Sequence, residues 1–158
     1  MQKWEINTLR ISIILIGMAI LLIFILWLPD IAKFSAVEYP EYAHLRYPIL
    51  IGLYITGAPF YLGIFHTFKL LKLIERDGAF TEEACKSLGA INLYAIIVIL
   101  LYISGMIFLL LNNALHPGLF LVGLGIMLVA FIISVFAAIL KGLLMKVVEI
   151  KNENDYTI

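Results

Sequence analysis

Four long apolar segments are the feature that most constrains this chain. A transmembrane helix needs roughly 20 predominantly apolar residues to cross a hydrocarbon core about 30 Å thick. The segments cover residues 11–28, 47–73, 90–111 and 119–144, and none of them contains Asp or Glu. The sequence therefore predicts an all-α fold: a four-helix transmembrane bundle formed as a single domain over residues 1–158. We expect the Pro29-Asp30 pair to end the first helix.

The composition agrees with a multi-pass protein of the cell membrane. Of the 158 residues, 63% are hydrophobic and 14% are charged, whereas soluble domains have about 45–50% apolar and about 25% charged residues. The formal net charge is zero, which argues against direct binding of nucleic acid. The chain has one cysteine, Cys85, so neither an intrachain disulfide nor a multi-cysteine metal site can form. We expect Cys85 to be a small packing residue.

The cationic residues are distributed unevenly between the two sides of the membrane. The first inter-helix loop carries only Lys33 and Arg46, and the turn between the third and fourth helices carries none. The other nine of the eleven lie before the first helix, around the junction of the second and third helices, or at and beyond the end of the fourth: Lys3, Arg10, Lys69, Lys72, Arg76, Lys86, Lys141, Lys146 and Lys151. The positive-inside rule then places both termini and the middle loop in the cytoplasm.

The connections between the helices are unequal in length. Residues 29–46 form a longer external loop whose aromatic residues we expect to lie in the headgroup layer. The Asn112–Gly118 turn is short, so the third and fourth helices should be antiparallel neighbours. In the middle loop, Thr81 suits a helix N-cap and is followed by two glutamates that favour the positive end of a helix dipole. The third helix should therefore begin at Glu82, about two turns before it enters lipid.

Three polar residues within the apolar segments are candidates for a functional role. His66, Asn92 and Tyr94 stand inside spans, where polar groups are costly and commonly mark functional sites. We favour a structural role for His66, with a hydrogen bond to Asn92 or Tyr94 on the next helix, over a role as a ligand or proton relay.

The chain lacks the residue patterns that most enzymes need. It has no H-E-x-x-H motif, no phosphate-binding glycine loop, no G-x-S-x-G elbow and no paired carboxylates inside the spans. We therefore expect a protein that is not an enzyme and that uses no catalytic residue, metal or other cofactor.

The polar C-terminal tail is the last candidate site. The apolar spacing predicts that the fourth helix extends into the cytoplasm to about Ile150, and that a turn follows over Asn152–Asp155. We expect the tail, residues 145–158, to fold back as a latch on the middle cytoplasmic loop or to dock a partner. The residues of this candidate docking or latch surface are Lys69, Lys72 and Arg76 on one side and Glu153, Asn154, Asp155, Tyr156, Thr157 and Ile158 on the other.

Two stretches and the tail together resemble the YoaS-like bacterial membrane proteins, a family described as domain of unknown function 2975. The stretches are APFYLGIFHTFKLLKLIERDGAFTEEACKSL and FAAILKGLLMKVVEIKNENDYTI, and the most specific element is the terminal pattern E-N-D-x-T-(I or V). Tyr156 stands where the family often has Leu. The resemblance covers essentially the whole chain and implies, as a partner, a small helix-turn-helix regulator of the Cro/repressor type.

Two functions remain open from the sequence. The first is a non-enzymatic regulatory membrane protein paired with a small cytosolic helix-turn-helix regulator. The alternative is a protein of lipophilic small-molecule binding, transport or immunity, for which the motivating features are a kink expected at Pro59, His66 and the interior tyrosines Tyr54, Tyr61 and Tyr94. The lipid bilayer is the expected environment in both cases, and a homo-oligomer stays open.

Overall fold

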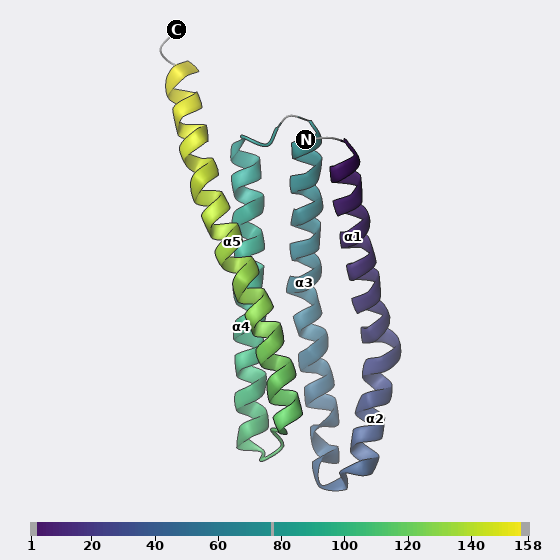
Figure 1. Cartoon of the computed structure of the whole chain (residues 1–158). Helices are drawn as coiled ribbons and strands as arrows, with labels where there is room; N and C mark the ends of the chain where they lie inside the picture. The colour runs from purple at the N-terminus through teal and green to yellow at the C-terminus, as the bar shows by residue number, and fades with distance from the viewer. Residues whose placement is uncertain (1–2, 77, 156–158) are drawn as a thin grey trace.

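Helices make up nearly all of the structure, a computed structural model that describes residues 3–76 and 78–155 (Figure 1). Four helices are long and apolar enough to cross a membrane. In chain order the elements are α1 (Lys3–Leu22), a π-helical segment (Ile23–Trp27), α2 (Leu28–Glu38), a 3₁₀ helix (Pro40–Leu45), α3 (Arg46–Glu75), α4 (Glu82–Leu111) and α5 (Pro117–Asp155). The predicted all-α class with four long apolar helices is confirmed, and the described residues contain no strand.

The first predicted helix does not end at Pro29. A proline inside a helix lacks the N–H that would bond to the preceding turn, and its ring crowds that turn. Here the chain adopts a π-helical turn over Ile23–Trp27, in which the N–H of Leu28 donates to the oxygen of Ile23 five residues earlier. If this pattern continued, residue 29 would donate to the oxygen of Phe24, but Pro29 has no N–H. The hydroxyl of Tyr54 on α3 donates to the Phe24 oxygen instead, at 2.9 Å, so helical structure continues as α2 to Glu38.

The long external loop expected over residues 29–46 is likewise mostly helical. Between the end of α2 and the 3₁₀ helix stands only Tyr39 outside a helix, with φ −124° and ψ 76°. Tyr42 in the 3₁₀ helix donates from its hydroxyl to the backbone oxygen of Asn113, at 3.0 Å. This bond joins the α2–α3 connection to the α4–α5 turn, so the two connections at this end of the molecule are held together.

The short turn between α4 and α5 is confirmed. α4 ends at Leu111 and α5 begins at Pro117. Asn113 adopts a left-handed conformation with φ 55°, which Asn tolerates better than most residues because its short side chain can hydrogen-bond locally. The turn makes α4 and α5 antiparallel neighbours, as Figure 1 shows.

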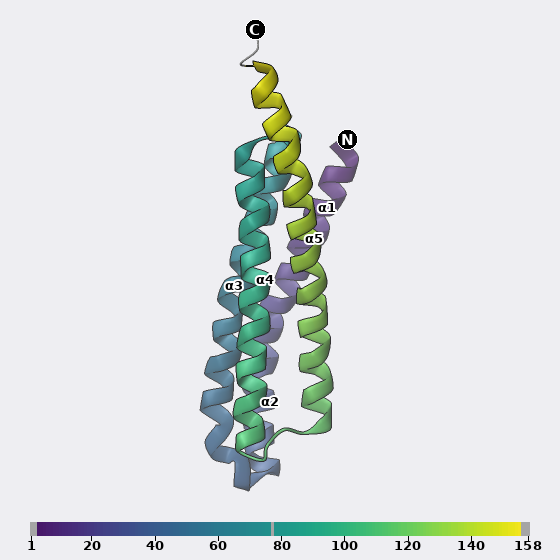
Figure 2. The same cartoon turned by 90° about the vertical axis from the view of Figure 1, so that its left-hand side faces the viewer.

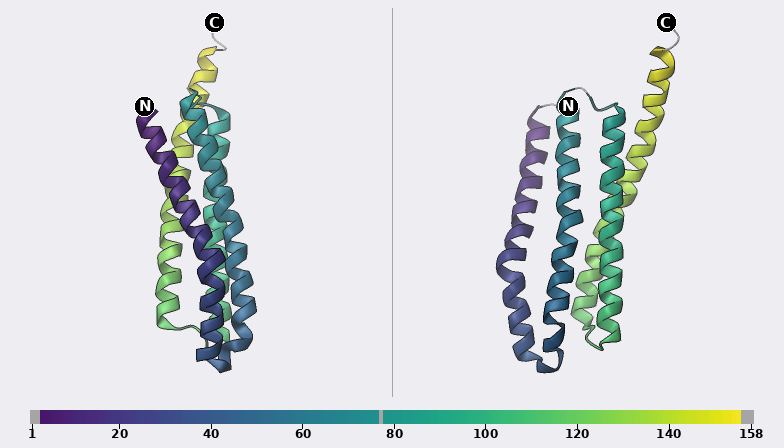
Figure 3. Two further views of the ribbon diagram at one scale, coloured as in Figure 1. Left: turned by 90° about the vertical axis from the view of Figure 1, so that its right-hand side faces the viewer. Right: turned by 180° about the vertical axis from the view of Figure 1, so that it is seen from behind.

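The helices are arranged as an open arc. α3 packs on α4 and α4 packs on α5 over long interfaces, whereas α1 and α2 touch α3 more sparingly. Within the described residues α1 and α5 share no substantial packing. Seen from behind, α3 lies between α1 and α2 on one side and α4 and α5 on the other (Figure 3). The first turns of α1, the last turns of α5 and the α3–α4 connection lie toward one end (Figures 1 and 2).

The residues buried between the helices are few and mostly small. They include Ile6, Thr56, Leu71, Ala84, Cys85, Ser87, Leu88, Ala95, Ala130, Ser134 and Ala137. Most large apolar side chains are exposed; Leu111, for example, is 78% exposed. This distribution is typical of helices that face lipid, where small residues allow close helix approach and large apolar ones need no protein cover.

Candidate functional site at the charged end of the molecule

The α3–α4 connection is built by local hydrogen bonds. The Gly78 N–H donates to the Leu73 oxygen at 2.8 Å and closes the end of α3. The Thr81 hydroxyl accepts from the Ala84 N–H at 3.4 Å and donates to the Gly78 oxygen at 2.8 Å. Thr81 is thus the N-cap of α4, and the predicted start of that helix at Glu82 is confirmed.

Two ion pairs join neighbouring helices at this end. Lys69 on α3 contacts Glu83 on α4 with its Nζ 2.9 Å from Oε1. The hydrogen bond that Lys69 donates, together with its positive charge, lowers the pKa of the Glu83 carboxyl. Glu83 precedes the apolar segment that starts at residue 90. Arg10 on α1 contacts Glu75 on α3 at 2.7 Å. These four charged residues therefore connect helices of this chain to one another.

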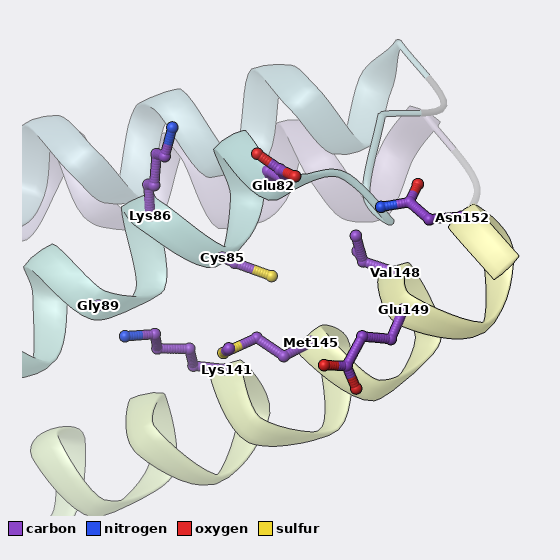
Figure 4. A pocket seen from close by; sticks show the side chains of 9 residues that line it. All are labelled: Glu82, Cys85, Lys86, Gly89, Lys141, Met145, Val148, Glu149 and Asn152. Atoms are coloured by element: carbon purple, nitrogen blue, oxygen red, sulfur yellow. The ribbon is translucent and has the colours of Figure 1, made fainter.

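A cleft of about 580 Å³ opens between the beginning of α4 and the far part of α5. Figure 4 shows residues from both helices around it. Four are charged, and the others are apolar, small or neutral polar; the lining consists of Glu82, Cys85, Lys86, Gly89, Lys141, Met145, Val148, Glu149 and Asn152. Neither His66 nor any of the interior tyrosines Tyr54, Tyr61 and Tyr94 lines this cleft.

Lys141 and Glu149 are the two charged residues that α5 contributes to the cleft. Lys141 lies along α4 so closely that a Cβ added to Gly89 would be 3.1 Å from its Nζ. The sulfur of Cys85, which is 7% exposed, points into the space between the helices (Figure 4). Within residues 3–76 and 78–155, the side chains of Lys141 and Glu149 have neither a hydrogen bond nor an ion pair. The arrangement leaves a cation and a carboxylate available to a ligand.

The three polar residues predicted inside the spans do not form one cluster. Asn92 on α4 accepts a hydrogen bond at its Oδ1 from the Ser134 hydroxyl on α5, at 2.6 Å, rather than bonding to His66. His66 on α3 lies beside Tyr94, with ring centroids 5.7 Å apart. Its Nδ1 is buried and has no hydrogen-bond partner within the part of the chain that the structure describes. Asn92 thus joins α4 to α5, and the His66–Tyr94 contact joins α3 to α4.

The predicted tail differs from the structure in its secondary structure. α5 is helical through Asp155, so the turn expected over Asn152–Asp155 is wrong: no proline or glycine interrupts the helix there, and it continues past Ile150 as Figure 1 shows. Tyr156, Thr157 and Ile158 lie outside the described residues, and the latch on the middle loop stays a prediction.

The cleft could not be predicted from its residues one at a time. Lys141 lies near the membrane edge, where a cation is ordinary, and Cys85 is small enough to be a packing residue. Met145 and Glu149 belong to no motif. One local signal is present: Gly89 stands inside a helix, where glycine costs about 1 kcal/mol relative to alanine. Such a glycine often marks a close approach, but the sequence does not show that Lys141 is what approaches it.

Four membrane-length helices with an exposed apolar surface define a membrane protein. The chain belongs to the family whose model is described as "Protein of unknown function (DUF2975)", which matches residues 30–158. It is 36% identical over 160 residues to the "Uncharacterized membrane protein YoaS" of Bacillus subtilis (strain 168), and the match covers the full length of both chains. No solved structure matches the chain.

Proposed function

We propose that this chain is a non-enzymatic regulatory membrane protein whose charged end lies in the cytoplasm and holds a small helix-turn-helix regulator. The observation that carries the proposal is the length of α5. Its 39 residues correspond to about 58 Å, nearly twice the hydrocarbon thickness of about 30 Å. α5 accordingly extends past the ends of the other helices (Figure 1).

The projecting part of α5 has the character of a docking surface. Val147 is 42% exposed and Ile150 is 60% exposed, and they alternate with charged residues such as Lys146 and Lys151. An exposed helix with apolar anchors amid charges is a common way of presenting a surface to a protein partner. The resemblance of the chain to its family supports a small DNA-binding regulator as that partner.

The cytoplasmic orientation is tested first. A fluorescent protein fused after Ile158 should fold and fluoresce, because nine of the eleven cationic residues lie at this end. A fusion of alkaline phosphatase at the same position should be inactive. An active phosphatase fusion would place the C terminus outside the cell and contradict the proposal.

The partner is tested by co-purification with candidate small helix-turn-helix regulators of the same cell. The full chain should retain such a regulator, and a chain that ends before Glu153 or carries Ile150→Asp should retain less. Leu111→Asp is the matched control, because Leu111 is also an exposed apolar residue at a helix end but lies at the opposite end of the molecule. Equal capture by all of these variants would remove α5 from the interaction, and no capture by the full chain would contradict the partner.

A further inference from the structure

The charges of the α4–α5 cleft are ordered by depth. Toward the middle of the molecule, Lys141 lies against Gly89. Along α4 toward its N terminus come Lys86 and then Glu82, and along α5 toward its C terminus comes Glu149. Because the two helices are antiparallel, both directions lead to the same end of the molecule. The cleft therefore has cations at its inner part and carboxylates at its outer part.

The cleft spans the headgroup layer of a bilayer and reaches beyond it into water. Gly89 lies seven positions after Glu82, which corresponds to about 10 Å along α4. The apolar segment of α4 begins at the next residue, 90. Each headgroup layer is about 5–8 Å thick, since a bilayer of about 40–45 Å contains a core of about 30 Å. The cleft thus runs from the edge of the hydrocarbon toward water, and Lys141 lies three residues before the end of the fourth apolar segment at residue 144.

The two charged side chains that α5 contributes to the cleft lack partners in the described part of the chain. Lys141 is half-buried at the inner end, and Glu149 is exposed at the outer end. Neither is bonded or paired within the described residues. A half-buried ammonium at the edge of the hydrocarbon is costly unless an anion accompanies it. The apolar part of the lining, with Met145 and Val148, suits a ligand that is both charged and lipophilic.

We propose that this cleft binds the headgroup of a phospholipid that carries a phosphate and a primary ammonium, as phosphatidylethanolamine does. The phosphate lies at the inner end and accepts from Lys141. The ammonium, two carbons further out, donates to Glu149. The glycerol and the first methylene groups pack on Met145 and Val148.

The charge balance of the cleft favours this headgroup over others. The four charged side chains that line it sum to zero, which complements a headgroup with one charge of each sign. Phosphatidylglycerol would place hydroxyl groups, with no cation, beside the Glu149 carboxylate. Phosphatidylcholine has a quaternary ammonium, which cannot donate a hydrogen bond to a carboxylate. This inference needs no regulator and therefore stands or falls separately from the proposed function.

The test uses the full chain purified in detergent and titrated with phosphatidylethanolamine, phosphatidylglycerol and phosphatidylcholine of the same acyl chains. Native mass spectrometry gives the apparent Kd of each lipid. We expect phosphatidylethanolamine to bind at least about tenfold more tightly than the other two, the effect of about one charge-assisted hydrogen bond. Equal binding of all three lipids, or a preference for phosphatidylglycerol, would overturn the proposal.

Two substitutions separate the ends of the site. Lys141→Gln should weaken both phosphatidylethanolamine and phosphatidylglycerol, whereas Glu149→Gln should weaken phosphatidylethanolamine alone and abolish the preference for it. Lys146→Gln is the matched control, since Lys146 is an exposed cation on the same helix that does not line the cleft. A loss with Lys146→Gln as large as that with Lys141→Gln would indicate general attraction to lipid and contradict the site.

Two further measurements cover folding and the source of the headgroup. Gly89→Val fills the space beside Lys141 and should weaken phosphatidylethanolamine without removing any charge; unchanged binding would contradict the placement of the phosphate. The melting temperature of each variant without added lipid reports whether it is folded. Soluble phosphoethanolamine should compete only at concentrations far above those of the lipid. Competition at equal concentration would assign the cleft to a soluble phosphomonoester and overturn the lipid.

Discussion

The α4–α5 and α1–α3 interfaces hold neighbouring helices together in different ways. On α5, Ala130, Ser134 and Ala137 are buried against α4, and Gly123 lies directly against the Met106 methyl group. This is a continuous seam of small residues along one side of the helix.

The α1–α3 interface has separate contacts instead of a seam. The tyrosine hydroxyls of α3 donate to backbone oxygens of the N-terminal helix, Tyr54 to Phe24 and Tyr61 to Gly17, each at 2.9 Å. The Phe24 ring occupies the space that a side chain at Gly57 would need, because a Cβ there would be 2.8 Å from the ring. Lipid tails are as apolar as leucine, so helices associate through close packing and hydrogen bonds. The α4–α5 interface relies mainly on close packing, and the α1–α3 interface relies mainly on hydrogen bonds.

The largest expected change in the free energy of unfolding comes from a substitution in the seam. Ala137→Leu adds three carbons at a position that is 3% exposed, and overpacking of this kind typically costs about 1–3 kcal/mol. Ala138→Leu is the matched control, because the adjacent alanine is exposed and should tolerate the same change. Unfolding in mixed micelles with increasing SDS measures both. Equal destabilisation by the two variants would mean that the seam is not closely packed.

The hydrogen bond at the π-helical turn gives the next largest effect. Tyr54→Phe removes the donor to the Phe24 oxygen and should cost about 0.5–1.5 kcal/mol. In a Pro29→Ala background the restored N–H can bond to the preceding turn, so the same substitution should cost less there. Tyr61→Phe is the control: the Gly17 oxygen lies far from Pro29 in the helix, so the cost should be the same in both backgrounds. Identical costs of Tyr54→Phe in both would contradict the assigned role of Tyr54.

These two interfaces also show what the sequence reveals about the fold. Features set by local sequence were predicted correctly: the number of long apolar helices, the cap at Thr81 and the short turn before α5. The end of the first helix was not, because the group that compensates for Pro29 is a hydroxyl at residue 54, on another helix. A local rule for proline has no access to that donor.

The candidate site shows the same limit more strongly. That Asn92 bonds to Ser134 and that Lys141 lies on Gly89 both depend on the register of α5 along α4. The short turn before α5 determines that these helices are neighbours, but the apolar segments leave their register open by several residues. For this reason the polar residues of the spans were identified individually, whereas their partners and the cleft were not.

The bond between Asn92 and Ser134 tests whether the seam also depends on polar contacts. A double-mutant cycle of Asn92→Ala and Ser134→Ala should give a coupling energy of about 0.6 kcal/mol, the average for such bonds within membranes. The same cycle between Asn92→Ala and His66→Ala should give none. Coupling of Asn92 to His66 in place of Ser134 would restore the pairing expected from the sequence.

The smallest effect concerns the ion pair that joins α3 to α4 at the charged end. Because Lys69 holds the pKa of Glu83 below its ordinary value, the folded protein binds this proton less readily than the unfolded chain. The pair therefore stabilises the fold above the ordinary pKa of a glutamate, and that contribution is lost as the pH falls through the lowered value.

Glu83→Gln should slightly reduce the melting temperature at neutral pH and leave it unchanged in acid below the lowered pKa. Since both side chains are substantially exposed, added salt should shrink the difference at neutral pH. A difference that persists in acid or in high salt would show that Glu83 acts through packing at the start of α4, and the charged end would then resemble the seam more than the contacts of α1 with α3.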